Sequence, residues 1–201
     1  MTSLDRKANS QQILAKLGME LKHDLPPLEE EDQLTFRSSN EVAQRILILT
    51  YLNCVANDPS LKQEVMVFLI GEKLWDKATE EERQLFHKTP LSEDELTIIL
   101  WRAEAIWLLL WVINKVDVLD VPAAEVNLHA IFANLPGFFE PTHQFIASAT
   151  RRPASAILDQ YDLMFRLTWA LKENNVPGMN PGVAFERYFA LNWVAGGEWK
   201  N

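Results

Sequence analysis

The sequence of 201 residues contains a single cysteine, Cys54, and this scarcity excludes two kinds of site. One thiol cannot form an internal disulfide, and it cannot supply the ligands of a cysteine zinc site. Cys54 lies between Asn53 and Val55 in an apolar helical pattern, so we expect a small buried hydrophobic residue rather than a nucleophile. The four histidines are scattered without HExxH or HxH spacing, and we expect no metal site and no other cofactor.

Clustered positive charge is also missing. The chain carries a formal net charge of −9, and its longest basic cluster is Arg151-Arg152. A protein that binds nucleic acid is expected to present a face rich in lysine and arginine, so we expect no nucleic-acid partner. No G-x-S-x-G, P-loop or G-x-G-x-x-G motif occurs either, so no catalytic signature indicates a reaction.

The sequence also lacks a hydrophobic run that is long enough to span a membrane. The longest one, Ile98–Ile113, is shorter than the roughly 20 residues that a membrane-spanning helix needs. It also contains Arg102 and Glu104, whose charges would be costly in lipid. The first residues, MTSLDRKANSQQ, are polar and contain no apolar core of a signal peptide. We therefore expect a soluble, cytoplasmic protein without membrane association.

What the sequence does contain is one long apolar helix, predicted over residues 92–116. Ser92 and Glu95 have the spacing of a capping box, in which each side chain accepts a hydrogen bond from a backbone amide at the helix start. The residues that follow are apolar on every side of the helical wheel, which is typical of a helix buried on all sides. We find no β alternation and no internal repeat. The predicted fold class is all-α, a single compact domain of about eight or nine helices packed around the buried central helix (92–116).

Caps and breaker residues delimit the other predicted helices. Two further capping boxes, Ser38 with Glu41 and Thr79 with Glu82, each mark a helix start. The predicted helices cover residues 9–21, 38–56, 59–75, 79–88, 122–133, 142–150, 155–173 and 183–194. Residues 1–37 are expected to form an N-terminal helix plus an acidic, proline-containing arm, and residues 38–201 a helical domain on which this arm packs. The acids at 29–32 are expected to form a solvated face.

Two loops, at 135–141 and 174–182, carry apolar residues among prolines and glycines. Phe138 and Phe139 lie in the first, and Val176 and Met179 lie in the second. Apolar residues on a loop can contact a partner or cover a site, but they more often fold back onto the core. We expect the second behaviour here.

Several segments of this chain recur together, in this order, in a known family. They are Arg6-Lys7 with Ser10, Leu14 and Gly18, the W-R-x-E-A run at 101–105, I-L-D-x-x-D-L at 157–163 with Arg166 and Trp169-Ala170, and Glu186-Arg187 followed by A-L-N-W at 190–193. Together they resemble the largely bacterial family called domain of unknown function 4272 (DUF4272), over most of the chain. The resemblance implies a compact α-helical domain and supplies no activity, substrate or cofactor.

Two charges lie within the predicted central helix, and each needs a partner because an unpaired buried charge is costly. Arg102 and Glu104 are two residues apart and therefore point about 200° apart around the helix, so they cannot pair with each other. Each must find its partner on another helix. Arg45 is one possible partner for Glu104, and Arg187 is another.

A second group of charges shares one face of the predicted helix at 155–173. Asp159, Asp162 and Arg166 follow i, i+3, i+7 spacing. Asp162 and Arg166 can pair within the helix, which leaves Asp159 to meet Arg102, while Glu186 could meet Arg166. Two carboxylates on one helical face could also hold a magnesium ion. Arg166 would neutralise such a site and no second carboxylate pair is evident, so we expect no metal there.

These residues give two interpretations of one candidate polar cluster. The cluster consists of Arg102, Glu104, Asp159, Asp162, Arg166, Glu186, Arg187, Trp101, Trp169, Asn192 and Trp193. The favoured interpretation is a structural network of salt bridges that ties helices together. The alternative is a polar pocket, walled by tryptophans, that binds a small ligand or hosts catalysis.

The function predicted from these patterns is a non-enzymatic module that binds another protein. Enzymatic activity is left open, with absence favoured. The alternative function is a small-molecule-binding protein or a hydrolase-type enzyme that uses the Arg102, Glu104, Asp159, Asp162 and Arg166 side chains. A homodimer built on the apolar central helix is a third possibility beside the monomer.

Overall fold

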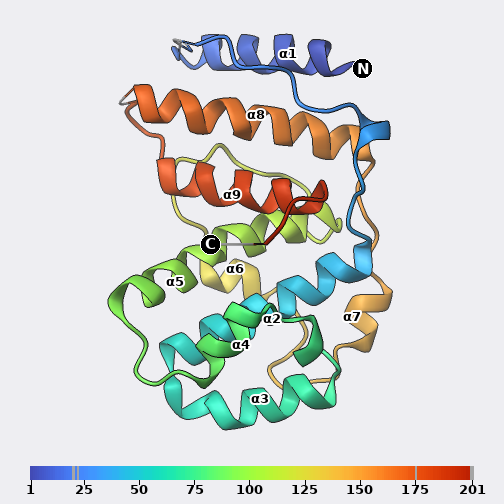
Figure 1. Ribbon diagram of the computed structural model, residues 1–201, viewed down its shortest axis with the longest axis vertical. Coiled ribbons are helices and arrows are strands. Elements are labelled where there is room, and N and C mark those ends of the chain that lie inside the picture. Colours follow the sequence, from blue (N-terminus) through green and yellow to red (C-terminus); the bar gives the residue numbers. More distant parts are fainter. Residues whose placement is uncertain (20, 22, 175, 200–201) are drawn as a thin grey trace. The chain divides into compact units, whose positions relative to one another are not determined.

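A computed structural model describes residues 1–19, 21, 23–174 and 176–199, and within this part of the chain it contains nine α-helices and no β-strand (Figure 1). The predicted all-α fold class is confirmed. The chain divides into two compact units. Unit 1 comprises Met1–Arg37, Leu119–Glu125 and Arg152–Asn201, and unit 2 comprises Ser38–Val118 and Val126–Arg151.

Unit 1 is built from three long helices and the arm that follows the first of them. They are α1 (Ser3–Lys16), α8 (Ala154–Glu173) and α9 (Pro181–Val194), with the short 3₁₀ helix η1 (Glu31–Gln33) in the arm. Helix α8 lies between α1 and α9 and contacts both (Figure 1). The prediction of a helix at 9–21 was wrong at both ends, because Thr2 and Asp5 form a capping box and the helix ends at Lys16, before Gly18. Residue 20 of that prediction lies outside the described residues.

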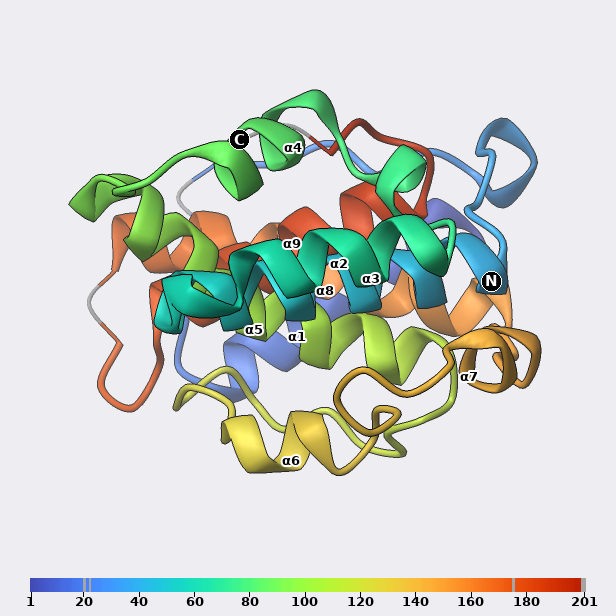
Figure 2. The ribbon, with the colours of Figure 1, turned by 90° about the horizontal axis from the view of Figure 1, so that it is seen from below.

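Unit 2 contains the remaining helices. They are α2 (Ser39–Asn57), η2 (Pro59–Leu61), α3 (Lys62–Gly71), η3 (Trp75–Lys77), α4 (Glu80–His87), α5 (Glu93–Val112), α6 (Leu128–Phe132) and α7 (His143–Ala147). Helix α2 contacts α3, α4, α5 and α7, whereas α6 packs against α5 (Figure 2). The three predicted capping boxes at Ser38, Thr79 and Ser92 all form, and each starts its helix where predicted.

The core of unit 2 is formed where α2 packs along α5. From Arg102 to Val112, every residue of α5 except Trp107 is buried, as its apolar pattern predicts. Helix α2 is buried to a similar degree, because all residues from Arg45 to Asn53 are buried. Arg45, Thr50 and Asn53 are polar residues within this buried stretch. Their side chains are accommodated by hydrogen bonds inside the core.

The helix predicted from Pro122 to Ala133 is reduced to α6, and the segment before it is not helical. The backbone carbonyls of this segment bond to other parts of unit 1 rather than within a helix. Asn180 N donates to the Pro122 carbonyl at 2.7 Å, and Arg187 Nη1 donates to the Asp120 carbonyl at 2.5 Å. Tertiary hydrogen bonds have replaced the helical ones, and no local sequence signal reports them.

The Phe138-Phe139 loop folds back onto the core of unit 2. Both rings pack on Tyr51, with ring centroids 5.2 and 5.9 Å away, and the Phe139 amide donates to the Tyr51 hydroxyl at 3.0 Å. Burial raises the pKa of Tyr51 to about 12, so the hydroxyl stays protonated. Phe138 remains 45% exposed, so the loop covers the core with one ring and shows part of the other to solvent.

The C-terminal end of α3 is joined to the start of α7 by one carboxylate. Glu72 Oε2 accepts hydrogen bonds from the amide and the hydroxyl of buried Thr142, at 2.8 and 2.6 Å. These bonds favour the charged form, and they lower the pKa of the Glu72 carboxyl below its usual value. The carboxylate therefore stabilises the fold only while it is ionised.

Replacing Glu72 should remove a stabilisation that depends on pH. Because the pKa is lower in the folded state, the contribution is present above about pH 4.3, the ordinary pKa of glutamate, and is lost as pH falls through the folded value. Glu72→Gln should lower the free energy of unfolding by about 1.5–3 kcal/mol at pH 7, and by progressively less below pH 4. Urea denaturation at a series of pH values measures this difference. The exposed Glu125→Gln serves as control, and a difference independent of pH would contradict the assignment.

The capping box of α2 provides a test of the local helix signal. The Ser38 hydroxyl accepts from the Glu41 amide, so Ser38→Ala should lower the free energy of unfolding by about 1 kcal/mol. Ser39→Ala, one residue further along, removes a hydroxyl that caps no amide and should change stability by less than about 0.5 kcal/mol. Thermal or urea unfolding of both variants measures the two changes in stability. Equal effects would show that the cap does not stabilise α2.

Candidate functional site

The predicted polar cluster is distributed over three helices. In unit 1, α8 carries Asp159, Asp162, Arg166 and Trp169, and α9 carries Glu186, Arg187, Asn192 and Trp193; in unit 2, α5 carries Trp101, Arg102 and Glu104. Most of these side chains are buried. The residues below 9% exposure are Arg102, Glu104, Asp162, Arg166, Glu186, Arg187 and Trp193. Trp169, by contrast, is 39% exposed, so it does not wall a closed pocket.

The centre of the unit 1 group is the ion pair between Asp162 and Arg166. The predicted pair within the helix is confirmed, with Arg166 Nε and Nη2 each donating to the Asp162 carboxylate at 2.9 Å. Arg166 is 0% exposed, and it also donates to the carbonyls of Leu25 and Pro26 at 3.2 and 2.9 Å. Four of the five N–H groups of the guanidinium therefore have acceptors. Arg166 fastens the proline-containing arm to α8.

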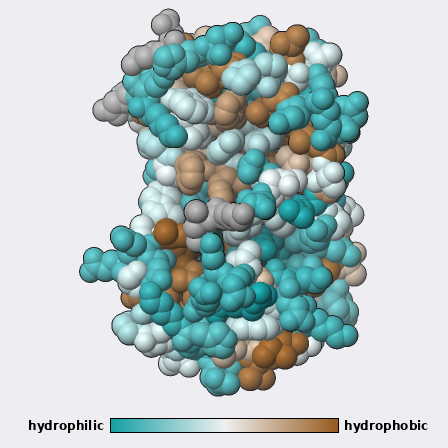
Figure 3. All heavy atoms as spheres, in the orientation of Figure 1, coloured by the Kyte–Doolittle hydropathy of each residue, from teal (hydrophilic) through white to brown (hydrophobic). Residues whose placement is uncertain are grey.

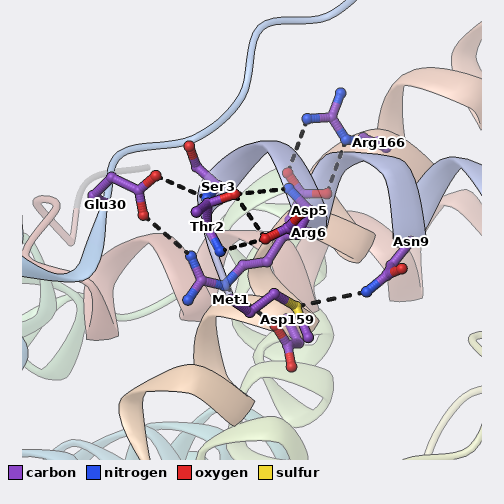
Figure 4. Close-up of polar contacts among 10 residues, drawn as sticks. Met1, Thr2, Ser3, Asp5, Arg6, Asn9, Glu30, Asp159 and Arg166 are labelled. Atoms are coloured by element: carbon purple, nitrogen blue, oxygen red, sulfur yellow. Dashed lines mark hydrogen bonds and ion pairs between the residues drawn. The ribbon is translucent and has the colours of Figure 1, made fainter.

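Asp159 lies one turn before this pair and meets a different arginine from the one predicted. Its carboxylate contacts Arg6 of α1 at 3.2 Å, whereas Arg102 was the expected partner (Figure 4). Figure 4 shows the buried Arg6 guanidinium pointing toward Glu30 as well, at 3.8 Å. Asp159 and Glu30 keep 45% and 42% of their side chains exposed, so both acids line the rim of this contact.

Glu30 belongs to the acidic stretch that we expected to form a solvated face, and its side chain is 42% exposed but also makes contacts within the chain. Its Oε1 accepts from the Ser3 amide at 2.8 Å, at the first turn of α1. This hydrogen bond lowers the pKa of the Glu30 carboxyl below its usual value, and nearby Arg6 adds to the effect. Five and four residues before Glu30, the carbonyls of Leu25 and Pro26 in the same arm accept hydrogen bonds from Arg166. The arm is therefore held at both ends by charged groups.

The α9 members of the cluster also contact backbone or neighbouring rings within unit 1. Arg187 donates to the Asp120 carbonyl, and the Asn192 side-chain oxygen accepts from the Tyr161 hydroxyl at 2.7 Å. Burial raises the pKa of Tyr161, which keeps this hydroxyl a donor. Trp193 packs edge-on against Trp199, with ring centroids 5.6 Å apart. The Arg187 and Trp193 contacts hold the segment at Asp120 and the chain near Trp199 on α9, and the Asn192 contact joins α9 to α8.

Buried charges in unit 2 behave in the same way. Arg45, a hypothesised partner of Glu104, pairs with Glu82 at 2.5 Å, and both side chains are buried. Glu82 also accepts from the Thr79 amide at 2.8 Å, so one carboxylate caps α4 and neutralises Arg45. The sequence had indicated only the first of these roles. Glu104 accepts a hydrogen bond from the Val126 amide, which holds the segment leading into α6 against α5.

Among the residues that the structure describes, no three histidine, cysteine, aspartate or glutamate side chains lie close enough together to ligate one ion. In the same part of the chain, no helix combines the length and the apolar character needed to cross a bilayer.

Several residues that matter for this arrangement were not predicted as site residues. Arg6 and Glu30 complete the contact around Asp159, and Glu72 and Glu82 hold two junctions in unit 2. Only Glu82 had a local signal, its capping-box spacing after Thr79. Chemically, these carboxylates hold arginines and backbone amides of their own chain.

The two aspartates of α8 allow the structural role to be measured. Asp162→Asn leaves the fully buried Arg166 without its counter-charge and should lower the free energy of unfolding by roughly 3–5 kcal/mol. Asp159→Asn is the matched control, because its half-exposed ion pair should contribute less than about 1 kcal/mol. Urea denaturation of both variants beside the wild type gives the two values. If Asp162→Asn is as stable as the wild type, the carboxylate is retained for function at some cost in stability.

Comparison with known proteins agrees with the resemblance seen in the sequence. Residues 6–201 match the family described as a domain of unknown function, DUF4272. No curated protein and no solved structure matches the chain. The match spans nearly the whole sequence, including α1, α5, α8 and α9, on which the recurring segments lie. The chain therefore belongs to the DUF4272 family.

Proposed function

We propose that this chain is a non-enzymatic module that binds another protein. The observation that carries the proposal is the use of Arg166 and Asp162. A catalytic or ligand-binding arginine needs a face open to the substrate, whereas Arg166 is 0% exposed and donates to Asp162 and to two carbonyls of its own chain. Charges of this kind stabilise a scaffold, and function is then expected at its surface.

A groove in unit 1 is the surface that we assign to this role. It is an apolar depression with a volume of about 80 Å³, between the end of α1, the 119–122 segment and α8. Its exposed rim is formed by Ile13, Leu17 and Val121, which are 41%, 38% and 56% exposed. Leu163 and Leu167 of α8 are among the side chains that line it. A groove of this size accommodates one aliphatic side chain of a partner, which is how interface anchors commonly bind.

The rest of the surface gives fewer reasons for choosing another docking site. On the face drawn in Figure 3, hydrophobic side chains form small groups among hydrophilic ones, including a group over α3, where Val67 and Ile70 are 60% and 58% exposed. Isolated apolar side chains are ordinary on protein surfaces. The groove differs from them because its exposed side chains surround a depression. The net charge of −9 favours a basic partner, since complementary charge speeds association.

The alternative, an enzyme or ligand-binding protein that uses the polar cluster, has less support. Asp159 is its most accessible acid at 45% exposure, and its contact with Arg6 occupies it. General acid–base catalysis requires a group that can reach a substrate proton at hydrogen-bond distance. The described contacts direct the cluster's side chains toward the chain itself.

Capture from a lysate of the source organism tests the proposed function. Immobilised wild-type protein should retain a specific protein, identified by mass spectrometry, whereas Val121→Asp should retain at least about tenfold less, because a carboxylate in an apolar contact must be desolvated. Leu17→Asp, on the opposite side of the groove, should have the same effect.

The control variant is Val67→Asp, which places the same charge on the exposed face of α3 and should retain the partner like the wild type. Far-ultraviolet circular dichroism should confirm that all variants are folded, and the mass in solution should exclude a homodimer that occupies the groove. Retention that is equal in the groove variants, or that is lost only in Val67→Asp, would reject the groove. A complete lack of specific retention would argue against the module itself.

A further inference from the structure

A cavity in unit 2 lies outside the polar cluster and outside the groove. It has a volume of about 190 Å³ and opens beside α6. It is lined by Thr50, Asn53, Cys54 and Asn57 of α2, Ala103 and Ile106 of α5, and Leu128, Ile131 and Phe132 of α6. From this geometry we infer a binding site for a small, uncharged, apolar molecule of the size of one or two aromatic rings.

The cavity exists because small side chains face one another where α2 and α5 pack. Thr50, Asn53, Cys54 and Asn57 follow i, i+3, i+4, i+7 spacing, so they form one stripe along α2, and none of them is large. Ala103 of α5 faces the same space with a single methyl group. Elsewhere α2 and α5 contribute many buried leucines and isoleucines to the core.

The third wall is provided by α6, a helix of five residues whose N-terminal end is held by two hydrogen bonds. The Asn127 side chain caps it by accepting from the His129 amide at 2.9 Å, and Glu104 of α5 accepts from the Val126 amide. Ile131 points inward and is 2% exposed, whereas Leu128 and Phe132 are 46% and 48% exposed at the mouth. The cavity is therefore apolar both at its base and around its opening.

The polar side chains in the wall donate their hydrogen bonds to backbone carbonyls. The Thr50 hydroxyl donates to the Ile46 carbonyl at 2.8 Å, and the Asn53 amide donates to the Ile99 carbonyl at 2.7 Å. Asn57 donates to the Asn53 carbonyl at 2.9 Å. These bonds turn the polar hydrogens toward backbone and leave mainly carbon toward the cavity.

No charged side chain lines the cavity within the described part of the chain. Burial raises the pKa of the Cys54 thiol, so the sulfur is neutral and behaves as a small apolar surface. An ionised ligand would lose its hydration without gaining a counter-charge, and it is therefore disfavoured.

The volume sets the size of the ligand. An apolar cavity of about 150 Å³ holds benzene in a well-studied engineered case, so 190 Å³ has room for benzene or for a fused pair of rings such as indole. Apolar pockets with few polar groups are the usual form of small-molecule sites. This inference is independent of the proposed protein partner, because groove and cavity share no residue.

Indole and benzene are suitable probes, and Cys54 supplies a readout in the unmodified protein. It is the only cysteine of the chain, so alkylation by iodoacetamide reports on this wall alone. Indole should bind the wild type at one site in calorimetric titration, and saturating indole should slow the alkylation of Cys54 at least about fivefold, because the bound ring covers the sulfur. Indole-3-carboxylate, which carries a charge, should bind at least about tenfold more weakly.

Filling the cavity provides the matched test. Ala103→Leu should weaken indole binding at least about tenfold, whereas Ala133→Leu, the same substitution at an exposed position outside the cavity, should leave it unchanged. Should Ala103→Leu fail to fold, protection of Cys54 in the wild type decides the question. No binding of indole or benzene, no protection of Cys54, equal binding of the carboxylate, or full binding by a folded Ala103→Leu would each overturn the inference.

Discussion

The burial of one guanidinium group constrains much of unit 1. Arg166 has no contact with solvent, and a buried charge is tolerated only when a counter-charge and hydrogen-bond acceptors surround it. Asp162 supplies the charge from within the helix, but the remaining N–H groups need acceptors from elsewhere, and the carbonyls of Leu25 and Pro26 provide them. The arm must therefore cross α8 at this position. One turn away, Asp159 meets Arg6, so α1 is placed by the same face of α8 that places the arm.

Unit 2 uses carboxylates for a comparable purpose. Glu82 joins the start of α4 to Arg45 of α2, Glu72 joins the end of α3 to Thr142, and Glu104 holds the backbone at Val126. In each case one carboxylate fastens a non-helical junction to a helix. Apolar packing gives more stability than a buried ion pair, but it still allows one segment to shift along another. A hydrogen-bonded carboxylate, in contrast, holds the segment that it contacts at one position. We infer that these groups select the path of the connecting segments rather than add to the strength of the core.

Local signals in the sequence predicted the helical fold well, but they could not predict which residues contact each other over long distances in the sequence. Capping boxes gave the starts of α2, α4 and α5, and the spacing of Asp162 and Arg166 gave a pair within one helix, because these contacts join residues three or four positions apart. Asp159 and Arg6 are 153 positions apart. Helical spacing shows on which face of its own helix Asp159 lies, but it does not show which distant residue packs against that face. Residues 122–127 were predicted as helix for the same reason, since the hydrogen bond from Asn180 N, at the start of α9, to the Pro122 carbonyl joins residues far apart in the sequence.

Polar and apolar residues have different roles in this structure, and the difference indicates where to look for function. The charged side chains whose contacts are described bind backbone and counter-charges within the chain, while the groove in unit 1 and the cavity in unit 2 are lined mainly by apolar side chains. Each methylene that a core leaves out forgoes about 0.8 kcal/mol of stabilisation. Larger side chains at Cys54 or Ala103 would recover part of this, because both lie beside unfilled space on otherwise well-packed helices. A scaffold fixed so firmly by its buried charges can keep such space open without losing its structure. Incomplete packing next to rigid helices is therefore the feature of this fold that most resembles a functional adaptation.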